Sequence, residues 1–157
     1  MAFAGMSTLG VTFGYGVEAA AGTKPEAFTV LTRINNIAGI TIENEQIDAS
    51  ALEDLVSRYI QGRADTGGTF PVSVNLTPET VTEWKTLISA YQEAYAAGKR
   101  MWFETIVPGF DDAFFVVAQP PSVIPQPEFA QNELLVAEMN LTIEEYVGLD
   151  TKVEFGA

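Results

Sequence analysis

The sequence predicts a mainly β fold with one α-helix, and three observations support this prediction. Hydrophobic and polar residues alternate along several segments, most clearly from Phe70 to Leu76. Prolines, glycines and aspartates with turn chemistry separate these segments. Residues 78–97 show clearly the three- and four-residue spacing of an amphipathic helix. A chain of 157 residues fits one domain, so we expect a single domain over residues 1–157.

The first 24 residues are apolar and rich in glycine, and we expect them to form an N-terminal arm that packs on another surface. From Met1 to Gly22 the only charged residue is Glu18. A signal peptide would carry basic residues before its apolar core. No stretch of the chain reaches the ~20 apolar residues of a membrane span. We therefore expect no membrane anchor and synthesis in a cytoplasm.

The remaining strands follow from period-two alternation and β-branched composition. Predicted strands cover Phe28–Ile37, Phe70–Leu76, Met101–Val107, Ala113–Gln119 and residues 133–144. The third and fourth form a hairpin over residues 99–119, because Pro108, Gly109, Asp111 and Asp112 supply a turn. In the last strand Leu135, Ala137, Met139, Leu141 and Ile143 alternate with polar residues. A stiff, proline-rich segment precedes it.

The helix has recognisable ends. Thr77 is a suitable N-cap, Pro78 suits the first helical position, and Glu79 complements the helix dipole. Gly98 tolerates the backbone conformation that ends a helix. One apolar stripe, which we expect to pack on the sheet, contains Val81, Trp84, Leu87, Ile88, Tyr91 and Tyr95.

Residues 44–68 form a long connection between two strands. Both ends are polar, whereas the middle contains Leu52, Leu55 and Val56 and predicts a short helix or a turn. Long connections in compact domains are usually functional. We therefore predict an interface loop here.

Residues that support catalysis are scarce. The chain contains no cysteine and no histidine, which excludes thiolate chemistry and the commonest general base. Adjacent carboxylates such as Glu53 and Asp54 do not converge on one point, and no EF-hand spacing is present. The run Gly14-Tyr15-Gly16 lacks the strand–turn–helix context of a dinucleotide site. We therefore expect no enzyme, no metal and no cofactor.

The charge balance is strongly acidic, with 21 Asp and Glu against 8 Lys and Arg and a formal net charge of −13. Proteins that grip DNA need positive charge to displace counterions from the phosphates. The charge is therefore consistent with simple colloidal repulsion, or with a surface past which DNA moves without sticking.

The order Ile47-Asp48, Leu52, Arg58-Tyr59-Ile60, Gly62, Asp65 and Gly67, followed by a strand and then a single helix, resembles the tail tube proteins of long-tailed bacteriophages (siphophages). The resemblance spans roughly residues 25–150. It implies a two-sheet antiparallel β-sandwich with one flanking helix (about 78–97) and a long inter-strand loop (about 44–68). It implies no C-terminal immunoglobulin-like decoration, because the chain stops soon after its last strand.

The resemblance also implies a virion protein that assembles in the host cytoplasm. Six copies would form a ring lined by a shared barrel, and stacked rings would form a tube through which DNA passes without specific binding. Other implied partners are a tape-measure protein and the tail-tip and terminator proteins. The inter-subunit or inter-ring contacts carried onto the long loop are Asp48, Leu52, Arg58, Tyr59 and Arg63. Our candidate lumen-facing residues are Glu138, Asn140, Thr142 and Glu144; the charges of Glu138 and Glu144 would repel phosphates, and Asn140 and Thr142 would offer only weak hydrogen bonds.

Two other interpretations stay open. The chain could be another tail component of the same fold, such as a tail terminator, a hub or a secretion-type tube. It could instead be a monomeric β-sandwich binding module, for which exposed aromatic platforms would be expected. Trp84 and Trp102 both lie in apolar patterns that predict burial, which favours the tail component.

Overall fold

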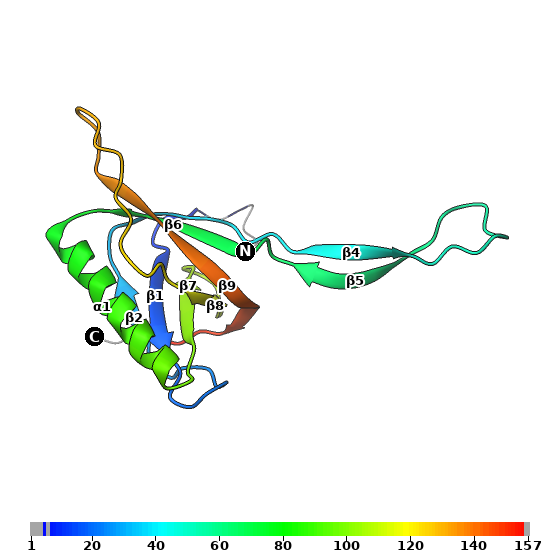
Figure 1. The fold of residues 1–157 in the computed structure, drawn as a ribbon, viewed down its shortest axis with the longest axis horizontal. Coiled ribbons are helices and arrows are strands. Elements are labelled where there is room, and N and C mark those ends of the chain that lie inside the picture. The colour runs from blue at the N-terminus through cyan, green and yellow to red at the C-terminus, as the bar shows by residue number, and fades with distance from the viewer. Residues whose placement is uncertain (1–4, 6, 156–157) are drawn as a thin grey trace.

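The computed structural model describes residue 5 and residues 7–155, which form nine β-strands and one α-helix (Figure 1). In chain order these are β1 (Thr12–Val17), β2 (Thr29–Leu31), β3 (Ile34–Ile37), β4 (Glu43–Asp48), β5 (Tyr59–Asp65), β6 (Thr69–Asn75), α1 (Pro78–Ala96), β7 (Met101–Ile106), β8 (Asp112–Gln119) and β9 (Val136–Thr151). The strands make two antiparallel sheets. The prediction of a mainly β, two-sheet fold with a single helix is confirmed.

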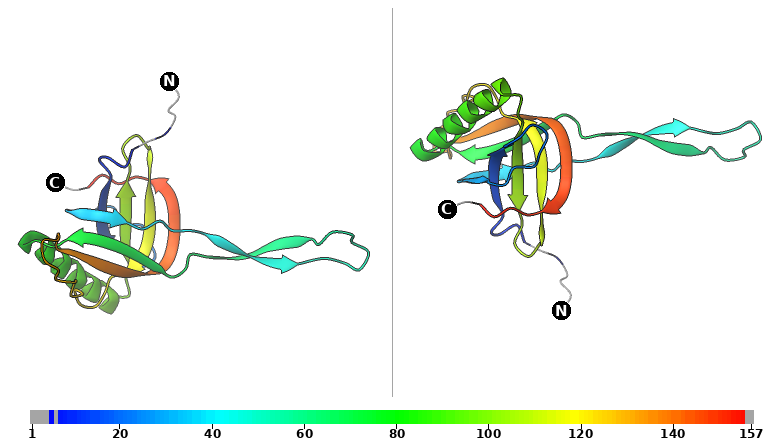
Figure 2. Two further views of the ribbon diagram at one scale, coloured as in Figure 1. Left: turned by 90° about the horizontal axis from the view of Figure 1, so that it is seen from above. Right: turned by 90° about the horizontal axis from the view of Figure 1, so that it is seen from below.

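The larger sheet has seven strands in the order β2-β1-β7-β8-β9-β6-β3. It bends because the long strand β9 pairs with β6 through residues 136–142 and with β8 through residues 142–151. Two register irregularities interrupt the β8–β9 ladder, and such bulges bend a strand. The first part of β9, with β6 and β3, therefore crosses over β1, β7 and β8 (Figure 2). The two layers are halves of one sheet, whose edge strands β2 and β3 are not paired with each other.

The main core lies between these two layers. The alternation predicted for β6 is confirmed, since Phe70, Val72 and Val74 are buried. In β9 the side chains of Ala137, Met139 and Leu141 are buried opposite them. From the other layer Phe13 stacks on Phe103 with ring centroids 5.6 Å apart. Each large side chain buried in this way contributes roughly 1.5–3 kcal/mol.

Helix α1 covers one end of the core. Thr77 is its N-cap, and Thr77 and Thr80 form a reciprocal capping box in which each side chain accepts from the other residue's backbone N–H. Gly98 follows the helix with a φ of 74°, as its position predicts. The side chains of Trp84, Leu87 and Ile88 are buried in the main core, whereas Tyr95 of the predicted stripe is exposed.

A second, smaller core lies on the other face of β7 and β8. It consists of Phe28, Trp102, Ala113, Phe115 and Val117, with Val153 and Phe155 packed against it. Gly14 and Gly16 make room for this layer: a Cβ on Gly14 would collide with the Phe155 ring, and one on Gly16 would lie 2.9 Å from the Phe28 ring. The Gly14-Tyr15-Gly16 run therefore has a packing role.

The observed boundaries of several strands differ from the predicted ones. Thr12–Val17 of the expected N-terminal arm (residues 1–24) instead forms β1, which pairs with β2 and β7; residues 1–4 and 6 of that arm lie outside the described residues. The strand predicted at 28–37 divides into β2 and β3, because Arg33 has a φ of 56° between them. The last strand begins at Val136 and continues to Thr151.

Candidate assembly surface

The long connection predicted between residues 44 and 68 is a projecting β-hairpin. Strands β4 and β5 pair only with each other in the described structure, from Glu43 opposite Asp65 to Asp48 opposite Tyr59. The hairpin extends away from the body of the molecule (Figure 1). The expectation of a loop holds only for its tip, residues 49–58, where the structure contains turns and no helix.

The tip is ordered by its own polar groups. The Asp48 carboxylate accepts from the Ser50 N–H at 2.9 Å, and the Asp54 carboxylate accepts from the Ala51 N–H at 2.8 Å. The Ser50 hydroxyl accepts from the Arg58 N–H at 2.7 Å, and Arg58 pairs with Asp54 at 3.3 Å. The Ser50 hydrogen bonds hold the pKa of Asp48 below its ordinary value. Asp48 and Arg58 therefore shape the tip.

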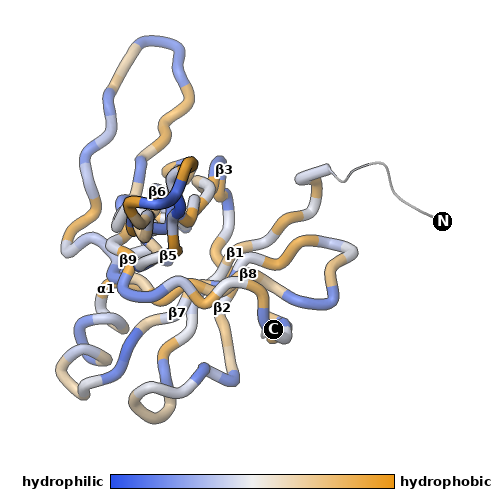
Figure 3. The backbone as a smooth tube through the Cα atoms, turned by 90° about the vertical axis from the view of Figure 1, so that its right-hand side faces the viewer, coloured by the Kyte–Doolittle hydropathy of each residue, from blue (hydrophilic) through white to orange (hydrophobic). Residues whose placement is uncertain are grey.

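The hairpin exposes apolar side chains along its whole length. Leu52 and Leu55 at the tip are 106% and 101% exposed. The others that are exposed are Ile42, Ile47, Val56, Tyr59 and Ile60. In Figure 3, with the hairpin directed toward the viewer, hydrophobic and hydrophilic segments are intermingled in this region. An isolated two-stranded hairpin is marginal in water, and exposed apolar clusters usually mark interaction sites.

The five residues predicted for the inter-subunit contact do not converge on one point. Leu52 lies at the tip, Tyr59 begins β5, and Arg63 lies near the base, where it lines a shallow groove with Glu43 and Glu45. The apolar tip itself combines Leu52 with Leu55 and Val56. All three belong to the segment for which the sequence predicts a short helix or a turn, so their exposure could not be predicted from their spacing.

A second exposed segment precedes β9. The proline-rich stretch of residues 120–135 extends from the body as a long loop (Figure 3). Its side chains Val123, Phe129 and Leu134 are 74%, 68% and 66% exposed. The molecule therefore presents apolar surface on two separate projections.

The four candidate lumen-facing residues are all exposed on β9, but the structure divides them. Glu138, Asn140 and Thr142 lie opposite Ser73, Pro71 and Thr69 of β6. These pairs form one polar face whose only acidic member is Glu138.

Glu144 lies at a register irregularity of β9, where strict alternation ends. It accepts a hydrogen bond from Gln119 and lines a small depression with Tyr91 and Tyr95 of the helix. The charge of Glu144 contributes, after burial, to raising the pKa of Tyr91. Glu144 thus belongs to a different surface from Glu138.

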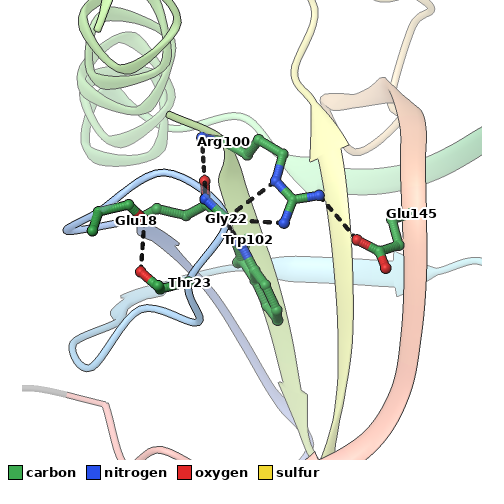
Figure 4. Close-up of polar contacts among 7 residues, drawn as sticks. Glu18, Gly22, Thr23, Arg100, Trp102 and Glu145 are labelled. Atoms are coloured by element: carbon green, nitrogen blue, oxygen red, sulfur yellow. Dashed lines mark hydrogen bonds and ion pairs between the residues drawn. The ribbon is translucent and has the colours of Figure 1, made fainter. Parts of the chain in front are cut away.

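A buried carboxylate fixes the N-terminal part of the sheet (Figure 4). Glu18 is 1% exposed and accepts hydrogen bonds from the Trp102 indole at 2.9 Å and the Arg100 N–H at 2.8 Å. The Arg100 guanidinium pairs with Glu18 at 3.1 Å and with Glu145 at 2.9 Å. Burial raises the pKa of Glu18, but the hydrogen bonds from Trp102 and Arg100 outweigh it, so the pKa lies below its ordinary value.

Glu104 is the second buried carboxyl group. It accepts from the Val153 N–H at 2.8 Å, while its Oε1 finds no donor within the described residues. Burial raises the pKa of Glu104, and the Val153 hydrogen bond opposes this shift. The group holds the C-terminal segment against the second core.

Across residues 7–155, no three acidic side chains gather in a way that could hold a metal ion. Helix α1, the one helix in that range, is not apolar enough to cross a membrane.

No family model matches the chain, and no curated protein matches it. Among solved structures, the chain is similar to a chain in the cryo-EM structure of the anti-feeding prophage baseplate, 6-fold symmetrised. The two share 12% sequence identity with a TM-score of 0.48, over 97% of this chain and 99% of that chain.

Proposed function

We propose that this protein is not an enzyme but a self-assembling structural subunit of a phage-type tail, and specifically a tail tube subunit. Six copies form a ring, and stacked rings enclose a channel through which DNA passes. The observation that carries the proposal is the projecting hairpin, whose apolar side chains are exposed to solvent in the single chain. A partner that covers them stabilises the hairpin, because burial contributes roughly 25 cal/mol per Å².

The sequence resemblance supports the same proposal. The residues that carry it, from Ile47 to Gly67, coincide with the hairpin, and the strand Phe70–Leu76 and the single helix follow in the resembling order. The open sheet adds a second argument. Edge strands β2 and β3 present unpaired backbone groups, and assembly into a ring would cover such edges.

The charge distribution is consistent with passage of DNA. A net charge of −13 disfavours tight binding of phosphates. The polar face around Glu138, Asn140 and Thr142 offers weak hydrogen-bonding groups and no cation, so it suits a channel wall. We assign this face to the lumen and leave Glu144 outside it.

Electron microscopy of the purified protein, together with its mass by light scattering, tests the proposal. Hexameric rings or hollow tubes of uniform width support it, and open-ended growth favours the tube over a terminator or hub. The tube proposal fails if the protein remains monomeric on concentration and also fails to polymerise on added tail-tip complexes. A monomeric binding module would then be the better description.

A further inference from the structure

The structure leaves a groove between the two edges of the main sheet. Strand β2 has three residues and pairs only with Phe13–Tyr15 of β1. Arg33, with its positive φ, then turns the chain toward β3 on the opposite edge. The start of β1 and the free edge of β3 therefore line the same groove, of about 960 Å³, without pairing.

The lining of the groove is mixed, with eight apolar and seven polar residues, and it carries a single charge. Its apolar lining includes Val11, Val30, Ile34, Ile37, Val107 and Phe114. Among the described residues that line it, Arg33 is the one charged side chain, and it is a cation in a chain of net charge −13. An occupant that combines apolar side chains, hydrogen-bonding groups and one free carboxylate would match this lining.

The hairpin tip has this composition. It exposes Leu52, Leu55 and Val56. Of its three charged residues, Asp54 and Arg58 are paired with each other, whereas Glu53 has no ion-pair partner within the described structure. The tip lies at the far end of a hairpin directed away from the body, so it does not reach the groove of its own chain (Figures 1 and 2).

We propose that the hairpin tip of one copy, residues 49–58, docks into the β1–β3 groove of a second copy, with Glu53 facing Arg33. This inference rests on the proposed function, because it names the surface that receives the hairpin. The contact joins two different surfaces of the same chain. Such heterologous contacts propagate from copy to copy and produce closed rings or open stacks.

Disulfide trapping between two single-cysteine proteins tests this contact. The natural chain has no cysteine, so every disulfide must join engineered positions. Leu52→Cys protein is mixed with Asn36→Cys protein under assembling, mildly oxidising conditions. The matched control replaces Asn36→Cys with Lys85→Cys, on an exposed position of α1. We expect a Leu52–Asn36 heterodimer as the main product and little coupling to position 85.

Charge reversal provides an independent readout. Glu53→Lys alone and Arg33→Glu alone should each raise the protein concentration needed for assembly about tenfold. The two changes in one chain should restore assembly.

The outcomes separate this contact from the function on which it rests. If rings or tubes form while position 36 couples no better than position 85, the hairpin docks elsewhere and this inference is wrong. Coupling of Asn36→Cys to a Met6→Cys protein in preference to Leu52→Cys would assign the groove to the N-terminal segment and contradict it as well. If no assembly forms under any condition, the proposed function itself is contradicted, and this contact with it.

Discussion

The Glu18 carboxylate accepts a hydrogen bond of 2.9 Å from the indole N–H of Trp102, although the two residues lie 84 positions apart. The same carboxylate accepts from the backbone and guanidinium of Arg100. It thereby ties the end of β1 to the start of β7. The carboxylate is buried and its partners need an acceptor. Removing this contact should therefore cost more stability than removing a surface ion pair.

Replacing Glu18 should therefore destabilise the fold. Glu18→Ala leaves the Trp102 indole and the Arg100 backbone N–H without their acceptor and leaves the Arg100 guanidinium with Glu145 alone, and we expect a loss of about 3 kcal/mol in the free energy of unfolding. Denaturant unfolding measures it. Glu26→Ala, at an exposed position, is the matched control and should change stability little. A loss no larger than that of the control would contradict the role assigned to Glu18.

The pH dependence of the stability that Glu18 contributes follows from the direction of its pKa shift. The pKa of Glu18 is lower in the folded state than its ordinary value of 4.5. Its stabilisation is therefore present above pH 4.5 and is lost as the pH falls through the folded-state pKa. The stability difference between the natural protein and Glu18→Gln should shrink over that range; a difference that stays constant with pH would show that the charge is not involved.

Glu104 should behave in the opposite way. Burial raises its pKa above 4.5 in the folded state, so its favourable contribution is complete below pH 4.5 and is lost as the pH rises through the folded-state pKa. Glu104→Gln keeps an acceptor for the Val153 N–H and removes the buried charge. We expect this variant to unfold at higher denaturant concentration at neutral pH, with the advantage disappearing at low pH. Lower stability of the variant at neutral pH would contradict this assignment.

Gly14 should resist substitution because of its neighbours rather than its backbone angles. A Cβ there would meet the Phe155 ring and lie 2.5 Å from the Thr29 carbonyl oxygen. Overpacking of this kind costs about 1–3 kcal/mol, and Gly14→Ala should lower the melting temperature accordingly. Gly39→Ala is the control, since nothing lies within 4 Å of the added Cβ. Equal melting temperatures for the two variants would remove the packing explanation.

The division of the acidic residues on β9 gives a prediction about the channel. If the face around Glu138 lines the lumen, Glu138→Lys should make assembled tubes retain short duplex DNA, because a cation binds phosphates. Glu144→Lys is the matched control, since Glu144 lies beside the helix. Binding of labelled DNA to assembled tubes measures both. Retention by the Glu144 variant alone would reverse the assignment.

Much of the sheet could be predicted because its signal is local. Alternation in β6 and β9, turn residues between β7 and β8, and the Thr77 cap each depend on residues adjacent in sequence. Strand β1 could not be predicted from the sequence, because Gly14 and Gly16 disfavour strands. The reason for these glycines is seen only in the structure, where Phe155 and Phe28 pack closely against them.

The break between β2 and β3 at Arg33 could not be predicted either, because the residues on both sides favour a strand. A positive φ at a non-glycine residue has little sequence signal. The consequence is large: one predicted strand becomes two that lie on opposite edges of the sheet.

The position of the candidate surface, residues 44–68, could be predicted from the sequence, but its structure as a projecting β-hairpin could not. The spacing of Leu52, Leu55 and Val56 predicts a short helix or a turn. The turn forms, because the side chains of Asp48, Ser50 and Asp54 satisfy backbone N–H groups there. The separation of Glu144 from Glu138 depends on a bulge in β9, which alternation alone cannot reveal.

The most direct measurement of the central claim is the mass in solution of a chain without its hairpin. Residues 43–65 are replaced by a short Gly-Ser turn, which retains the pairing of Ile37 with Val72 at the base. We predict a protein with native-like circular dichroism that stays monomeric by light scattering at concentrations where the full chain assembles. Assembly of the truncated chain into the same rings or tubes would contradict the claim that the hairpin drives assembly.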